Sequence, residues 1–230
     1  MDTNTDIIIT MNEMLPLYHA FDALFPIGAY TLSGGMETYT QMGIVCDKGT
    51  LNAFLNAQVY ILPYSDLGIA AKAAEGMDFI YLDHLCAAMK QPHEIRTGSE
   101  KMCSRFLKIQ SELADYPSLS AYRAEIAQGH CDGHYPVAVG LFIRDTGVPN
   151  GAALEMYCYS ILSLTVNHAV KLIPLGQSDG QSALFETLRL IPSAVQKALV
   201  VSIEDLGVSG CGFDLRSIQH ETLKGRLYSS

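Results

Sequence analysis

Apolar residues recur at helical spacing along most of this 230-residue chain, and this periodicity constrains its fold more than any other feature. One run, at i, i+3, i+4, i+8 and i+11, is Leu51, Phe54, Leu55, Val59 and Leu62. Similar runs lie within residues 79–89, 95–113, 119–126 and 184–199. Positions three or four apart share one face of a helix, whereas strands alternate at period two. Because such alternation is nearly absent, the sequence predicts an all-α fold of seven to nine helices.

Helix-breaking residues separate these runs, namely Pro63, Gly76, Pro92, Pro117 and the segment 147–151. Pro192 falls inside the run 184–199 and predicts that this helix is kinked or split. No shift in composition marks a domain boundary, so we expect residues 1–230 to form a single domain with one sizeable core.

The composition excludes two classes of protein. Hydrophobic residues make up 49% of the chain and charged residues 17%, which is incompatible with a disordered chain. The net charge is −9, and a nucleic-acid-binding protein usually carries a basic patch. This acidic balance favours a basic protein partner or cations over nucleic acid.

The apolar stretch 152–173 is close to the length that a membrane-spanning helix needs. It contains Glu155, His168 and Lys171, and ionisable residues are rare within a span. Its polar positions form one narrow stripe, which is typical of a central helix buried in a protein core. We therefore expect no membrane span here, and we interpret His168 as a core histidine with a hydrogen-bond partner.

The segment Met1–Asp6 has no basic region of the kind that begins a signal peptide, and none of the six cysteines forms a CxxC pair. These features predict a cytoplasmic protein with reduced thiols.

One short segment resembles a nucleotide-binding motif, and the chain lacks the common catalytic motifs. Lys48-Gly49-Thr50 resembles part of a phosphate-binding loop, but that loop needs the order Gly-Lys-Ser/Thr after a strand. We interpret it as a loop that leads to Thr50 as a helix N-cap. The chain has neither a GxSxG nor an HExxH motif, so the sequence predicts no enzymatic activity and no cofactor.

The segment His130, Cys131 and His134 is a weak candidate for a metal site, because imidazole and thiolate ligands suit Ni²⁺, Zn²⁺ or Cu²⁺. So short a segment would need further ligands from elsewhere in the fold. The favoured interpretation is a polar turn before a helix that starts near Pro136. A metal-dependent hydrolase and a metal carrier remain alternatives, and either would hold stoichiometric metal when purified.

Two segments fall outside the helical pattern: a glycine-rich loop (residues 25–35) and a C-terminal tail (residues 206–230). From Ser217 onward the tail has four large apolar residues, Ile218, Leu223, Leu227 and Tyr228. Burying them would stabilise an ordered tail by roughly 6–12 kcal/mol, whereas fixing its backbone costs about 14 kcal/mol or more. The tail is therefore predicted to fold onto a partner.

Motifs spread along the chain resemble the UreF family of urease accessory proteins. They are LFPIGAYTLSGGMET at 24–38, HYPV at 134–137, PLGQSDGQ at 174–181, RSIQHET at 216–222 and RLYSS at 226–230. The resemblance covers nearly the whole chain, with the motifs in the family's order. Two departures lie in the tail: Lys224-Gly225 replaces a common Tyr-Ser pair, and Tyr228 replaces the more usual Phe.

This resemblance implies an all-α, homodimeric, cytoplasmic assembly factor without catalytic residues or a cofactor of its own. Such proteins join the UreD (or UreH) scaffold and the UreG GTPase on apo-urease, regulate GTP hydrolysis and assist nickel insertion into the urease active site. It also implies a partner-binding set in the two non-core segments: Tyr30, Ser33, Glu37, Arg216, His220, Glu221, Arg226, Leu227 and Tyr228. The alternative is a nickel-binding metallochaperone that uses His130, Cys131 and His134.

We further expect a contact between Tyr30 and Arg226. Both residues stand in the non-core motifs, and a planar guanidinium suits the face of an aromatic ring. Such a contact would fix the tail on the body of the protein.

Overall fold

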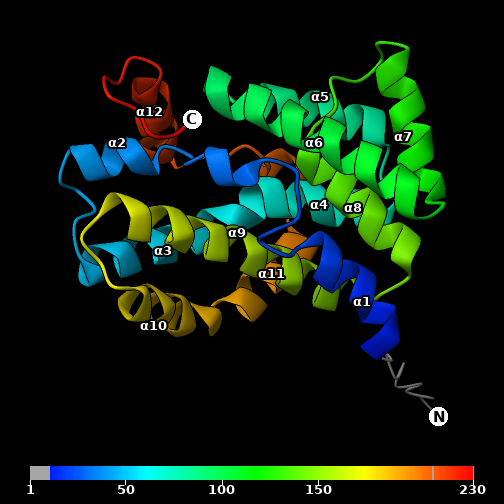
Figure 1. Ribbon diagram of the computed structural model, residues 1–230. Coiled ribbons are helices and arrows are strands. Elements are labelled where there is room, and N and C mark those ends of the chain that lie inside the picture. Colours follow the sequence, from blue (N-terminus) through cyan, green and yellow to red (C-terminus); the bar gives the residue numbers. More distant parts are fainter. Residues whose placement is uncertain (1–10, 209, 230) are drawn as a thin grey trace.

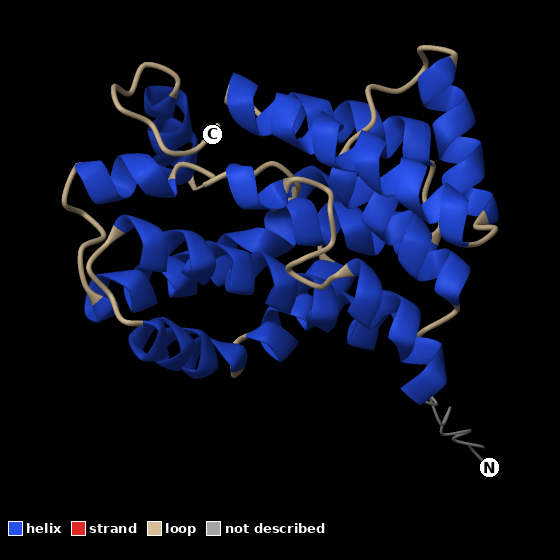
Figure 2. Ribbon diagram, viewed as in Figure 1, coloured by secondary structure: helices blue, strands red, loops and turns tan. Residues whose placement is uncertain are grey.

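The computed structural model describes residues 11–208 and 210–229. This part of the chain consists of twelve α-helices and three short 3₁₀ helices, with no strand (Figures 1 and 2). The all-α prediction is confirmed, but the helices are more numerous than expected. The split predicted at Pro192 is also confirmed: the run 184–199 forms α10 and α11, with the proline at the start of α11.

The α-helices are α1 Met11–Ala20, α2 Met36–Gln41, α3 Lys48–Ile61, α4 Asp66–Glu75, α5 Phe79–Met89, α6 His93–Leu113, α7 Pro117–Ala127, α8 Tyr135–Thr146, α9 Asn150–Leu172, α10 Gln177–Leu188, α11 Ile191–Val200 and α12 Cys211–His220. The 3₁₀ helices are η1 Ala29–Thr31, η2 Leu62–Tyr64 and η3 Ile203–Asp205.

The core is built on α4, α8 and α9. Helices α4 and α8 approach closely because Gly140 has no side chain: a Cβ there would lie 2.3 Å from the carbonyl oxygen of Ala70. Helix α9 buries an apolar face that includes Leu154 and Leu162, as expected for a central helix. Among the residues described, no helix is both long enough and apolar enough to cross a membrane.

The start of α3 corrects one expectation. The N-cap is Asp47 rather than Thr50. The Asp47 carboxylate accepts a hydrogen bond from the Thr50 N–H at 2.8 Å, and the Thr50 hydroxyl oxygen accepts one from the Asp47 N–H at 3.0 Å. This reciprocal pair satisfies two N–H groups at the helix end and makes Thr50 the third residue of the helix.

The tail also differs from its prediction. Helix α12 and residues 221–229 lie on the body of the same chain, with α12 packed against α2 and α6 (Figure 1). Of the four expected apolar anchors only Tyr228 is buried, while Ile218 is 44% exposed and Leu227 is 66% exposed. The polar residues Ser217 and His220 are buried as well. The tail is thus held largely by polar groups. The sequence-based comparison of apolar burial with backbone entropy did not include their contribution, and so it predicted a tail that needs a partner.

Candidate functional site

The glycine-rich loop allows two other segments to approach its backbone. Gly28 has a φ of +84°, and the Arg105 guanidinium lies where a Cβ would stand and donates to the Ile27 carbonyl oxygen at 3.1 Å. Gly35 has a φ of +82°, and a Cβ there would lie 2.7 Å from the Ser217 hydroxyl oxygen on α12. Glycine tolerates this conformation and leaves room for the contact. The loop therefore forms part of the surface against which the tail packs.

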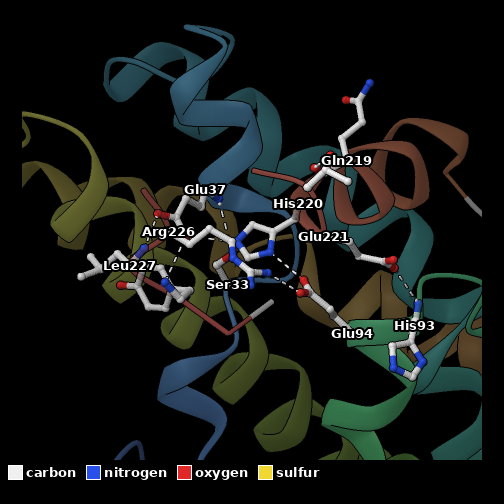
Figure 3. Close-up of polar contacts among 11 residues, drawn as sticks. Ser33, Glu37, His93, Glu94, Gln219, His220, Glu221, Arg226 and Leu227 are labelled. Atoms are coloured by element: carbon white, nitrogen blue, oxygen red, sulfur yellow. Dashed lines mark hydrogen bonds and ion pairs between the residues drawn. The ribbon is translucent and has the colours of Figure 1, made fainter. Parts of the chain in front are cut away.

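Four ionisable side chains join the tail to the body, and we call them the clasp: Glu37, Glu94, His220 and Arg226 (Figure 3). The fully buried His220 ring lies between two carboxylates. Its Nδ1 is 2.7 Å from Glu94 Oε2, and its Nε2 is 3.1 Å from Glu37 Oε2. Helices α2, α6 and α12 thus meet through one imidazole ring.

Glu37 is the centre of the clasp. Its Oε1 accepts a hydrogen bond from the Leu227 N–H at 2.6 Å, and its Oε2 accepts one from the Tyr228 N–H at 3.0 Å. Burial by itself would raise the pKa of Glu37, but the bonds from Leu227, His220 and Tyr228 together lower this pKa below its usual value. The carboxylate is therefore held ionised and fixes both the backbone and the helix of the tail.

Contrary to expectation, Arg226 does not pair with Tyr30. Its guanidinium forms an ion pair with Glu94, which also contacts His220. Tyr30 is 62% exposed, and its carbonyl oxygen accepts a hydrogen bond from His168 Nε2 at 3.2 Å. The predicted contact is therefore wrong, because a partly buried carboxylate offers the guanidinium a stronger partner than an exposed ring.

His168 supports the end of the tail from α9. Its ring lies edge to face with the Tyr228 ring at 4.8 Å between centroids, and the Ser229 N–H donates to the Thr31 carbonyl oxygen at 2.8 Å. The expectation of a core histidine with a partner is confirmed. Burial lowers the pKa of His168 to about 4, although its hydrogen bond to Tyr30 acts in the opposite direction.

We expect His168 to make the protein sensitive to acid. The folded protein keeps this ring neutral while the unfolded chain takes up a proton near pH 6.5, so stability falls as the pH drops below that value. Between pH 6.5 and pH 4 this contribution amounts to about 3 kcal/mol in the free energy of unfolding.

Urea unfolding followed by circular dichroism at pH 6.5, 5.5 and 4.5 would measure the effect. His168→Gln should lose less stability than wild type over this range, because glutamine does not titrate. An equal loss in both proteins would contradict the assignment.

Three other predicted residues also lie at this junction. The buried Ser33 hydroxyl oxygen accepts a hydrogen bond from the Glu37 N–H at 3.4 Å. Glu221 accepts one from the N–H of His93, the first residue of α6, at 3.1 Å (Figure 3). Arg216 lies over the Tyr39 ring and donates to Gln219. The structure therefore brings the predicted loop and tail residues to one place.

Sequence reasoning missed Glu94, which belongs to none of the motifs. Its only local signal is an acidic residue in the first turn of a helix, a common and unspecific feature. Ser217, whose backbone meets Gly35, stands in the motif RSIQHET but was not among the predicted site residues, because nothing in the local sequence indicates which residue will face it.

The three candidate metal ligands do not converge. The exposed His130 ring pairs with Glu125 at 2.6 Å, while Cys131 and His134 are buried. Burial raises the pKa of the Cys131 thiol to about 12, so this residue is not a thiolate at neutral pH. Within the described part of the chain, these three side chains form no group with metal-ligand spacing.

The expected turn before α8 is present, with Gly129 and Gly133 at positive φ, but Cys131 and His134 in it are buried. The buried Asp83 carboxylate accepts hydrogen bonds from the N–H groups of Asp132, Gly133 and His134, and from the Tyr122 hydroxyl. Ligand atoms of Asp83, Asp132 and His134 lie within 4.8 Å of one another. Because both Asp83 oxygens already accept several hydrogen bonds, this carboxylate acts as a structural cap before α8.

Comparisons with known proteins agree with the sequence motifs. The UreF family model matches residues 45–188. The urease accessory protein UreF of Arthrobacter sp. (strain FB24) is 34% identical over 218 residues, which is 94% of this chain and 96% of the relative. UreF of Actinobacillus pleuropneumoniae serotype 5b (strain L20) is 32% identical over 227 residues, covering 96% of this chain and 100% of the relative.

Proposed function

This chain belongs to the UreF family of urease accessory proteins, and on that premise we propose that it is a non-catalytic scaffold for urease maturation. In this role it joins the UreD/UreH scaffold and the UreG GTPase on apo-urease in the cytoplasm, as a homodimer. The complex influences GTP hydrolysis and inserts nickel into urease, so nickel is its cargo.

The observation that carries this proposal is the single surface formed by the glycine-rich loop and the docked tail. The clasp fixes the inner side of the tail, whereas Tyr30, Leu215, Ile218 and Leu227 keep much of their surface exposed. Exposed aromatic and aliphatic residues on a rigid support are typical of the centre of a protein interface. This surface is therefore the proposed docking site for the partner proteins.

Leu227→Asp changes a side chain that is 66% exposed and makes no contact in the clasp, and hydrogen exchange of the Tyr228 amide, which donates to Glu37, checks that the tail stays docked. We expect at least about tenfold weaker assembly with the UreD/UreH scaffold and UreG, since a charge replaces an apolar contact at the interface. Pull-down and titration with the purified partners would measure the loss.

Leu113→Asp provides the matched control. Leu113 is 55% exposed and lies at the far end of α6 from the tail. Its substitution should leave assembly unchanged. Normal assembly of Leu227→Asp, or equal losses in both variants, would contradict the proposed surface.

A further inference from the structure

The protonation of His220 is set by its two contacts. A neutral imidazole has one N–H donor and one lone pair, whereas an ionised carboxylate only accepts hydrogen bonds. Both ring nitrogens of His220 face carboxylate oxygens, at 2.7 Å and 3.1 Å. With a neutral ring, one lone pair would point at a carboxylate oxygen. The clasp is therefore complete only when both nitrogens carry a proton.

The charges around this ring lead to the same conclusion. Glu37 faces it from α2 and Glu94 from α6, and Arg226 reaches Glu94 from the tail. A protonated His220 balances these groups, since two negative charges then meet two positive ones. A neutral ring leaves a net negative charge where His220 is inaccessible to water, and an unbalanced buried charge is costly.

Two other charged side chains near the clasp contact different groups. Arg216 donates to Gln219, and Glu221 accepts from the His93 backbone. Within the described residues, only Glu37 and Glu94 form ion pairs with His220. The proton on the His220 ring therefore determines whether the positive and negative charges of the clasp balance.

We propose that the clasp is a proton-dependent latch, which holds residues 221–229 on the body when His220 is protonated and releases them when it is neutral. The inference rests on the proposed function, because release of the tail would dismantle the partner-binding surface. Docking should accordingly weaken as the pH rises from 6 to 8.5. Glu37 does not interfere in this range, since its pKa lies below the usual value for a glutamic acid.

Hydrogen exchange of the Leu227 and Tyr228 amides reports docking directly, because both N–H groups donate to Glu37. The measurement uses the isolated full-length chain at pH 6.0, 7.0 and 8.5. Exchange is expressed as a protection factor, which removes the intrinsic effect of pH. We expect protection to fall at least about tenfold between pH 6.0 and pH 8.5, the loss of one charge-assisted hydrogen bond.

Two variants remove the switch in different ways. His220→Gln should lower protection at pH 6.0 and abolish its pH dependence. Glu94→Gln should reduce the pH dependence, because an amide can either donate to or accept from Nδ1 and so tolerates a neutral ring. His93→Gln is the matched control, since it changes a neighbouring histidine outside the clasp, and it should behave as wild type.

Unchanged protection of the wild type across this range would overturn the latch, as would a wild-type pH response in His220→Gln. A parallel fall in the amides of α8 and α9 would also overturn it, because it would indicate global unfolding. No partner protein enters this experiment. Failure of the latch is therefore distinguishable from failure of the proposed function, which the Leu227→Asp assembly test decides.

Discussion

Glu37→Ala is expected to free the tail and to prevent assembly with the UreD/UreH scaffold and UreG. The substitution leaves the Leu227 and Tyr228 N–H groups without their acceptor and removes one of the two carboxylates that hold His220. Each hydrogen bond to a charged group contributes about 1.5–3 kcal/mol, and the three are not additive. A loss of about 3 kcal/mol, or roughly a hundredfold in docking, is the minimum expected.

Limited trypsin digestion would detect the freed tail, because cleavage after Lys224 or Arg226 needs a backbone segment that can enter the protease, and in the wild type Glu37 holds the neighbouring Leu227 and Tyr228 N–H groups. Circular dichroism should show an otherwise folded protein, since Glu37 lies outside the core of α4, α8 and α9. Glu37→Gln should give an intermediate result, because the amide oxygen still accepts a hydrogen bond. A tail as resistant to trypsin in Glu37→Ala as in wild type would contradict the central role of this carboxylate.

Gly35→Ala should displace α12 from its packing position against α2. A Cβ at this position would lie 2.7 Å from the Ser217 hydroxyl oxygen and 3.1 Å from the Ser217 backbone nitrogen. The side chain of Ser217 can rotate away, but the backbone of a packed helix cannot move without breaking its contacts. We expect loss of tail docking and of partner assembly comparable to that of Glu37→Ala.

Gly34→Ala is a close control for this effect. Gly34 also has a positive φ, of +61°, but a Cβ there would meet no atom within 4 Å. The control therefore carries only the conformational cost of alanine in this region, about 1–2 kcal/mol. Hydrogen exchange of the Leu227 and Tyr228 amides would compare the two variants. Equal protection of these amides in Gly35→Ala and Gly34→Ala would show that the close approach at Gly35 does not contribute to tail docking.

The sequence was sufficient for the helical architecture. Helical periodicity is a local property, since positions three or four apart face the same side whatever the rest of the chain does. The all-α class and the buried α9 followed from it, whereas the break at Pro192 followed from the proline itself. The number of helices was underestimated, because several short helices have too few turns to show a period.

The sequence also singled out the loop and tail motifs, which the structure brings together, but it predicted the wrong contact between them. Tyr30 and Arg226 were matched because both stood in motifs, whereas Arg226 pairs with Glu94, 132 residues away. The N-cap of α3 shows the same limit at short range, since Asp47 and Thr50 are both good capping residues. Composition alone does not decide between such alternatives.

Only the tertiary structure decided how the tail is held. The contact between His220 and Glu94 joins residues 126 positions apart, and the contact between Tyr228 and Glu37 joins residues 191 apart. Such pairs leave no periodic signal, because they depend on how α2, α6 and α12 pack against one another. The sequence determined which helices form, since each helix is encoded by neighbouring residues. The tertiary fold determined which buried charges meet, because burial and distance exist only once those helices have packed.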